Sequence, residues 1–176
     1  MIVRIVLFAV AGAAVFMKFR PHLLSFNTHA PYVFTAFELL LGLMFLNMPF
    51  VLQWPPDVWS QALSWFLLIA SAAFAVGGFT AIKRYGKAGR DWEDTTELVK
   101  KGVFRYIRHP LYSSLMLLSV GLLLRNVGAL PVVLCLCSLA FLAMASVVEE
   151  KENTAKFGDL YREYMEGTRR YIPFVL

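Results

Sequence analysis

Residues 108–150 read "RHPLYSSLMLLSVGLLLRNVGALPVVLCLCSLAFLAMASVVEE". This stretch holds two apolar runs, 111–124 and 129–148, with only a few residues between them. A connection this short joins antiparallel neighbours. The stretch therefore predicts a helical hairpin whose two polar ends lie at the same level.

Three further apolar runs, 2–16, 30–52 and 62–82, precede the hairpin. The chain has 176 residues, of which 59% are hydrophobic, so its apolar surface exceeds what a soluble core of this size can hide. Runs of about 20 residues cross a membrane, and the shorter first and fourth runs need flanking residues or tilt. We expect one all-α integral membrane domain with about five transmembrane helices, divided into residues 1–82 and 83–176.

The basic residues predict the orientation of the chain. Fifteen of the seventeen lysines and arginines follow the first, third or fifth run, and only Arg4 and Arg125 do not. Because basic residues favour the cytoplasmic side, we expect an external N-terminus and a cytoplasmic C-terminus. As a separate expectation, we place the protein in a prokaryotic plasma membrane. Cleavage of the first run as a signal peptide would leave Lys18 and Arg20 on the wrong side. Nothing in the sequence resembles a nucleic-acid-binding module.

Charged residues gather at the two polar ends of the hairpin. Pro110 suits the first turn of the fourth helix, which places Arg108 and His109 at its N-terminal end, where free backbone N–H groups attract anions. Glu149 and Glu150 end the other arm. The two ends together predict a site that can hold a zwitterion. A simpler alternative is that Arg105 and Arg108 pair with Glu149 and Glu150 and hold the hairpin closed.

The segment after the hairpin should also be ordered. We expect the fifth helix to stop at Gly158, and Asp159 to cap a short helix that ends near Gly167. Tyr161 and Tyr164 would share one face of that helix. They suit either the site or a membrane interface.

Three blocks carry a family resemblance: "GVFRYIRHPLY" (102–112), "EE" (149–150) and "FGDLYREYMEGTRRYIP" (157–173). In this order they resemble the integral membrane methyltransferases that include isoprenylcysteine carboxyl methyltransferase and the phospholipid N-methyltransferases. The resemblance implies methyl transfer from S-adenosylmethionine at the cytoplasmic face, in a pocket built by the last helices and a C-terminal tail. Two positions depart from the family pattern, Ser114 and Gly167, and the second leaves the acceptor open.

The resemblance also implies which residues form the site. The first block supplies Tyr106, Arg108, His109, Pro110 and Tyr112, the second supplies Glu149 and Glu150, and the tail supplies Tyr161, Tyr164, Arg170 and Pro173. Among these, Arg108 or His109 suits the carboxylate of the cofactor, and Glu149 or Glu150 suits its ammonium group. The adenine suits an aromatic or aliphatic wall formed by Val103, Phe104 and Tyr106.

The acceptor decides which other groups take part. A carboxylate acceptor needs a cation to orient it, for which we choose Arg170, with Arg169 as second choice. An amine acceptor must lose a proton, so a glutamate or histidine would matter more. Glu38 lies within the second apolar run, where an ionisable group is costly; it either lines the route of the acceptor or has a structural partner. We expect no metal site, because Cys135 and Cys137 point to different faces of a helix.

The sequence therefore predicts methylation of a lipophilic or prenylated acceptor drawn from the membrane, most simply an isoprenylcysteine-like carboxylate. A phospholipid amine and a small thiol are alternative acceptors. An NADPH-dependent membrane reductase of the sterol or enone type is a second hypothesis. A non-enzymatic membrane scaffold or transporter is the third.

Overall fold

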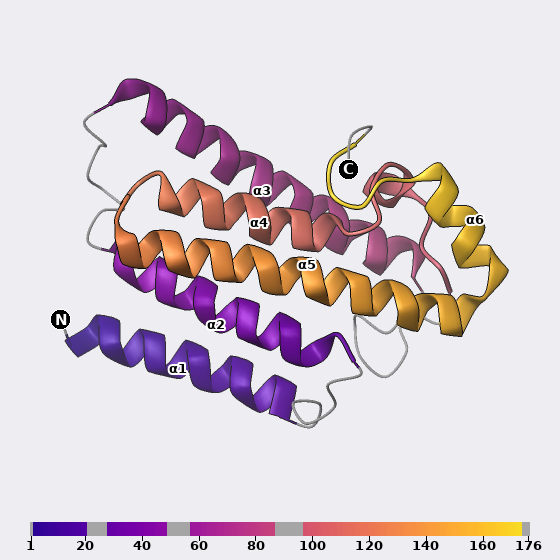
Figure 1. Cartoon of the computed structure of the whole chain (residues 1–176), viewed down its shortest axis with the longest axis horizontal. Coiled ribbons are helices and arrows are strands. Elements are labelled where there is room, and N and C mark those ends of the chain that lie inside the picture. The colour runs from indigo at the N-terminus through magenta and orange to yellow at the C-terminus, as the bar shows by residue number, and fades with distance from the viewer. Residues whose placement is uncertain (1, 21–27, 49–56, 87–96, 174–176) are drawn as a thin grey trace. The chain divides into compact units, whose positions relative to one another are not determined.

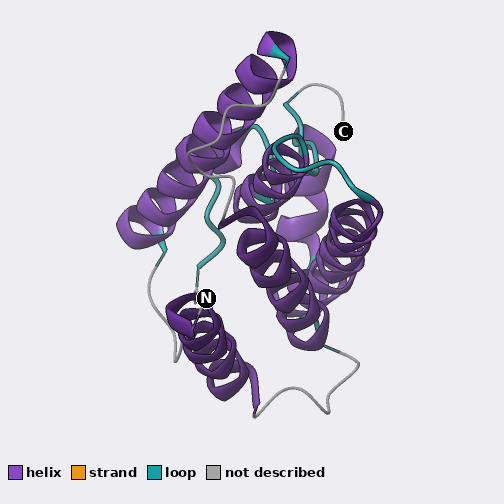
Figure 2. Ribbon diagram, turned by 90° about the vertical axis from the view of Figure 1, so that its left-hand side faces the viewer, coloured by secondary structure: helices purple, strands orange, loops and turns teal. Residues whose placement is uncertain are grey.

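The computed structural model describes residues 2–20, 28–48, 57–86 and 97–173, and most of these residues form helices (Figures 1 and 2). Each apolar run forms a helix: α1 (Ile2–Phe19), α2 (Ala30–Asn47), α3 (Val58–Tyr85), α4 (Pro110–Leu123) and α5 (Ala129–Phe157). A 3₁₀ turn, η3 (Gly102–Arg105), precedes α4, and α6 (Asp159–Gly167) follows α5. The described residues contain no β-strand, which confirms the all-α prediction.

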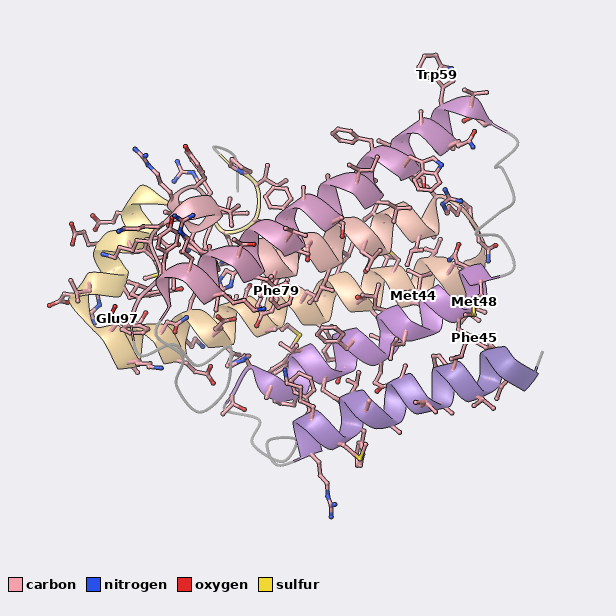
Figure 3. All side chains as sticks on the ribbon, turned by 180° about the vertical axis from the view of Figure 1, so that it is seen from behind. Met44, Phe45, Met48, Trp59, Phe79 and Glu97 are labelled. Atoms are coloured by element: carbon pink, nitrogen blue, oxygen red, sulfur yellow. The ribbon has the colours of Figure 1, made fainter. Side chains whose placement is uncertain are left out.

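Three of the described helices, α2, α3 and α5, are long and apolar enough to cross a membrane. The helices α1 and α4 are apolar but shorter. Large hydrophobic side chains on the helices remain exposed; Trp59, in the first turn of α3, is 83% exposed and projects outward (Figure 3). Exposed apolar surface on this scale suits contact with lipid. The helices therefore fit a membrane protein, while the number of crossings stays a prediction.

The chain divides into two compact units. Unit 1 comprises Met1–Leu68 and Met116–Glu149, and unit 2 comprises Ile69–Leu115 and Glu150–Leu176. The helices α3, α4 and α5 each contribute residues to both units.

In unit 1, α1 lies alongside α2 (Figure 1). The ring of Phe8 lies 5.2 Å from that of Phe45, and the ring of Phe19 lies 6.1 Å from that of Phe34. These contacts pair the start of one helix with the end of the other, so the two helices are antiparallel. Aromatic pairs at such distances stabilise the packing beyond the area they bury.

Unit 1 also holds one end of the predicted hairpin. The hydroxyl groups of Ser119 in α4 and Ser138 in α5 lie 3.3 Å apart, and both residues are fully buried. Ser64 in α3 donates a hydrogen bond of 2.8 Å to the carbonyl of Gly121. Hydroxyl groups that bond across helices satisfy polar atoms that would otherwise be buried alone.

In unit 2, α3 packs closely on the start of α4. A Cβ on residue 78 would lie 2.8 Å from Cδ2 of Leu111, so any larger residue in place of Gly78 would require the Leu111 side chain to shift. Ser71 donates a hydrogen bond of 2.7 Å to the carbonyl of Ser114. These contacts fix the first turn of α4 against α3. The helix α4 begins at Pro110, as predicted.

Candidate active site at the start of α4

The C-terminal tail pairs with the segment that leads into α4. The backbone N–H of Arg108 donates to the carbonyl of Arg169 at 2.8 Å, and that of His109 donates to the carbonyl of Arg170 at 3.1 Å. In return, the N–H of Arg169 donates to the carbonyl of Tyr106 at 3.1 Å. The two N–H groups just before α4, which we expected to attract an anion, are therefore occupied by tail carbonyls.

Ser113, in the first turn of α4, extends this pairing. Its hydroxyl group lies 2.8 Å from the carbonyl oxygen of Tyr171 and 3.0 Å from that of His109. Because the side chain of Ser113 is buried, its hydrogen bond to the carbonyl of Tyr171 holds the tail without competition from water. Sequence reasoning missed this role, since a serine in an apolar helix has many uses.

The centre of the site is a cluster of four side chains, which we call the Glu150 cluster: Arg108, His109, Glu150 and Arg170. Oε1 of Glu150 accepts hydrogen bonds from Nε of Arg108 at 2.9 Å and from Nε of Arg170 at 3.1 Å, and lies 3.3 Å from Nε2 of His109. Oε2 accepts a second bond from the guanidinium group of Arg170. The prediction that the start of α4 faces the acidic end of α5 is confirmed for Glu150.

The cluster keeps Glu150 ionised. This residue lies beyond the apolar run that ends at residue 148, and its side chain is 10% exposed. Burial acts to raise the pKa of Glu150, but the hydrogen bonds from His109, Arg170 and Arg108 prevail and hold it well below its usual range. The hydrogen bond to Glu150 in turn raises the pKa of Arg170. A carboxylate held in this way is a weak base.

Arg108 also connects the cluster to α6. Its Nη1 donates to the carbonyl oxygen of Met165 at 3.0 Å and to that of Thr168. The last carbonyl groups of a helix lack partners within the helix, and a cation there is favourable. Arg108 therefore joins the end of α6 to Glu150 on α5.

The turn between α5 and α6 depends on Gly158. This residue has φ +59°, a left-handed conformation that favours glycine, and the chain turns sharply there (Figure 1). Gly158 is also the N-cap of α6, so the prediction of Asp159 as the cap was wrong. Asp159 instead occupies the first turn and pairs with Arg162 at 2.9 Å.

The two tyrosines of α6 pack inside unit 2. The rings of Tyr161 and Tyr164 lie 5.8 Å apart on one face, and both side chains are buried. The hydroxyl group of Tyr164 donates a bond of 2.6 Å to the carbonyl of Phe104, and burial raises the pKa of Tyr164. This packing holds α6 against η3 and disfavours the alternative that the tyrosines anchor the chain at a membrane interface.

Three other predicted residues lie in or next to η3 and the first turn of α4. The ring of Tyr112 stacks on that of His109, with centroids 5.3 Å apart and planes within 4°. Val103 packs against α3: a Cβ atom built on Gly77 of α3 would lie 3.8 Å from the Cβ of Val103. Tyr106 is half-exposed. Its aromatic ring is therefore accessible to a ligand, as the prediction of an adenine wall requires.

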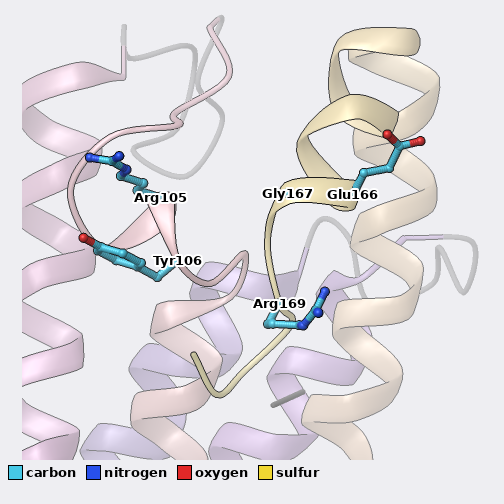
Figure 4. A pocket seen from close by; sticks show the side chains of 5 residues that line it. All are labelled: Arg105, Tyr106, Glu166, Gly167 and Arg169. Carbon is cyan, nitrogen blue, oxygen red and sulfur yellow. The ribbon is translucent and has the colours of Figure 1, made fainter. Parts of the chain in front are cut away.

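A shallow hollow of about 230 Å³ opens beside Tyr106. Arg105 and Tyr106 lie on one side of it, and Glu166 and Arg169 project from the other side (Figure 4). Arg169 thus takes part in the tail pairing through its backbone, while its side chain is exposed. The structure does not bring the guanidinium group of Arg169 into the Glu150 cluster.

Two predicted acids lie outside the cluster. Glu149 precedes Glu150 on α5, so its side chain leaves the helix about 100° away. Glu38 belongs to unit 1 and lies close to Gly12: a Cβ atom built on Gly12 would be 3.3 Å from Oε2 of Glu38. Its Oε1 is buried without a hydrogen-bond partner among the described residues. A role for Glu38 on the acceptor route stays a prediction.

The chemistry of the Glu150 cluster fits S-adenosylmethionine. Two guanidinium groups and an imidazole surround one carboxylate, so the cluster has positive charge to spare for the carboxylate of the cofactor. Glu150 suits the ammonium group of the cofactor. The cluster can therefore recognise both charges of an amino acid moiety.

The comparison with protein families agrees with this chemistry. The model of the family described as phospholipid methyltransferase matches residues 59–159, more than half of the chain. The match includes Arg108, His109 and Glu150 but ends before the tail. A search of curated proteins finds no match. The chain therefore belongs to the phospholipid methyltransferase family, and family membership implies a membrane methyltransferase.

Proposed function

We propose that the protein transfers a methyl group from S-adenosylmethionine to a lipophilic acceptor, most simply an isoprenylcysteine-like carboxylate. The observation that carries this proposal is the Glu150 cluster, three of whose four residues lie inside the family match. The family match also removes support from the reductase and scaffold hypotheses.

The residues of the cluster divide the work of binding. When bound, S-adenosylmethionine supplies a methyl group that its sulfonium already makes electrophilic. Glu150 holds the ammonium group, and Arg108 or His109 holds the carboxylate. Tyr106 offers an aromatic face to the adenine. Catalysis then depends on orientation of the acceptor and on exclusion of water.

The state of Glu150 favours a carboxylate acceptor. A protonated amine must lose a proton before it attacks, and a glutamate with a lowered pKa is a weak base. A carboxylate needs no base, only a cation that orients it, and Arg170 is partly exposed in the tail. The family description favours the second candidate, a phospholipid amine. A small thiol is a third possibility for the acceptor.

The proposed topology has five crossings, with α1 and α4 completing theirs through flanking residues or tilt. The distribution of basic residues supports it, because five crossings place fifteen of seventeen on one side. The N-terminus then lies outside, and the Glu150 cluster lies at the cytoplasmic face of a prokaryotic plasma membrane. A lipophilic acceptor would reach the site from the lipid, and Glu38 is proposed to line its route.

Transfer of a radiolabelled methyl group tests the proposal. Purified protein in detergent is incubated with labelled S-adenosylmethionine and either a membrane lipid extract or a farnesylcysteine probe. Label that mild base releases as methanol identifies a methyl ester and supports a carboxylate acceptor. Base-stable label in a phospholipid would show that the acceptor is a phospholipid amine and not a carboxylate. Binding of NADPH without binding of S-adenosylmethionine would contradict the proposal altogether.

A further inference from the structure

We propose that Arg170 and the ammonium group of the cofactor compete for the same carboxylate, that of Glu150, and that binding of the cofactor releases Arg170 toward the acceptor. This inference rests on the proposed function. In the structure, both oxygens of Glu150 accept hydrogen bonds from Arg170. A guanidinium group engaged in this way cannot at the same time orient an acceptor, so the two roles require an exchange of partners.

Arg170 is the member of the cluster that is most easily displaced. Its side chain is 36% exposed, compared with 11% for Arg108. Arg108 also donates to two carbonyl groups at the end of α6. Among the described residues, the side chain of Arg170 donates only to Glu150. Displacing Arg170 therefore breaks one ion pair, while displacing Arg108 would also undo the end of α6.

The exchange requires motion of one side chain only. The carbonyl of Arg170 is held by the N–H of His109, and the next carbonyl, that of Tyr171, is held by Ser113. On the other side of the Arg170 side chain, the carbonyl of Arg169 is held by the N–H of Arg108, so the backbone is fixed both before and after it. The side chain itself has several rotatable bonds and loses little by adopting another rotamer at a partly exposed site.

Exchange avoids the cost of an unpaired buried charge. Removing one partner from a buried ion pair is strongly destabilising, because the other charge stays buried without compensation. If the ammonium group replaces the guanidinium group as it leaves, Glu150 keeps a cationic partner throughout. The released guanidinium group stays close to the bound cofactor, because its backbone is fixed. It then provides the cation that a carboxylate acceptor needs.

The affinity for the cofactor shows whether Arg170 competes with the cofactor for Glu150 or helps to bind it. We expect Arg170→Ala to bind S-adenosylmethionine more tightly than the natural protein, by roughly two- to fivefold, because a partly exposed pair is a weak competitor. Isothermal titration calorimetry in detergent measures this affinity. Arg162→Ala is the matched control, since it removes an exposed cation of the same region that lies outside the cluster. Its affinity should equal that of the natural protein.

Each outcome bears on one of the two proposals. Weaker or unchanged binding by Arg170→Ala, with binding by the natural protein intact, would overturn the exchange and leave the proposed function standing. Absence of binding by the natural protein would overturn the proposed function itself.

A second measurement observes the side chain directly. In protein labelled with ¹⁵N-arginine, the Nε–H resonance of Arg170, assigned by its loss in Arg170→Lys, should shift when S-adenosylhomocysteine is added. This probe carries the ammonium and carboxylate groups but no methyl group to transfer. A resonance that stays in place at saturation would contradict the exchange.

Discussion

Glu150 and Glu38 are two glutamates carried by apolar helices, and their surroundings differ. Glu150 in unit 2 is contacted by two guanidinium groups and an imidazole. Glu38 in unit 1 faces the backbone of Gly12, and one of its oxygens is buried without a partner among the described residues. Glu150 is part of a charge network, whereas Glu38 occupies space left by a glycine.

The comparison separates two reasons for a buried acid. A carboxylate whose hydrogen bonds are all satisfied by cations contributes binding chemistry and holds the surrounding segments together. A carboxyl group with an unsatisfied oxygen lowers stability unless a ligand completes it. Substitutions in the two environments should therefore have opposite effects on folding.

Glu150→Gln should give the largest effect. It leaves the nearly buried guanidinium group of Arg108 and the partly exposed one of Arg170 without a carboxylate, and breaking such a network costs about 3–5 kcal/mol. Thermal unfolding in detergent measures the loss, and Glu163→Gln, an exposed change on α6, should unfold like the natural protein.

The effect of Glu150→Gln should also depend on pH. Because the pKa of Glu150 is lowered in the folded protein, its contribution is present above the ordinary value of 4.5 and is lost as the pH falls through the folded value. The difference between the two proteins should therefore persist at neutral pH and shrink in acid. A difference that grows in acid would contradict the account of the cluster.

Arg108→Lys should have the second largest effect. Lysine keeps the charge but cannot contact Glu150 and the carbonyls at the end of α6 at the same time, so we expect a loss of about 1–3 kcal/mol. Hydrogen exchange of the amides of α6 should accelerate. Equal exchange rates in the two proteins would show that Arg108 does not connect α6 to the cluster.

Tyr164→Phe sharpens the comparison by testing a neutral contact near the cluster. It removes the hydrogen bond to the carbonyl of Phe104 and should cost about 0.5–1.5 kcal/mol, without a charge effect. Thermal unfolding at low and high salt checks both points. A strongly salt-dependent loss would mean that Tyr164 belongs to the charge network.

Glu38→Met should have the smallest effect and the opposite sign. Replacing the carboxyl group by an apolar group of similar length removes the unsatisfied oxygen, so stability should stay unchanged or rise by up to about 1 kcal/mol. Thermal unfolding measures it. A clear loss of stability would reveal a structural partner, and loss of methylation with normal cofactor binding would support the proposed role on the acceptor route.

The sequence predicted the parts of the fold that depend on local pattern. The apolar runs became helices, Pro110 begins α4, and Gly158 ends α5. The contact between Arg108 and Glu150 could also be predicted, because the short hairpin connection determines which helix ends lie side by side. These features follow from hydrophobic periodicity, turn-forming residues and the length of a connection, all of which can be read directly from the sequence.

The details of the site depend on contacts that local pattern does not encode. The tail pairs with residues about sixty positions earlier through backbone groups, and every residue except proline has these groups. For the same reason, the roles of Ser113 and Thr168 could not be predicted. The pairing of Arg170 with Glu150 was also missed, because the charge of Arg170 suited an acceptor equally well.

Calorimetric titration of S-adenosylmethionine into the natural protein, Glu150→Gln and Glu38→Met in detergent tests whether Glu150 binds the cofactor. If it does, we expect saturable binding by the natural protein, affinity within about twofold for Glu38→Met, and a loss of about a hundredfold or more for Glu150→Gln. Equal affinity of the folded Glu150→Gln protein and the natural protein would contradict it.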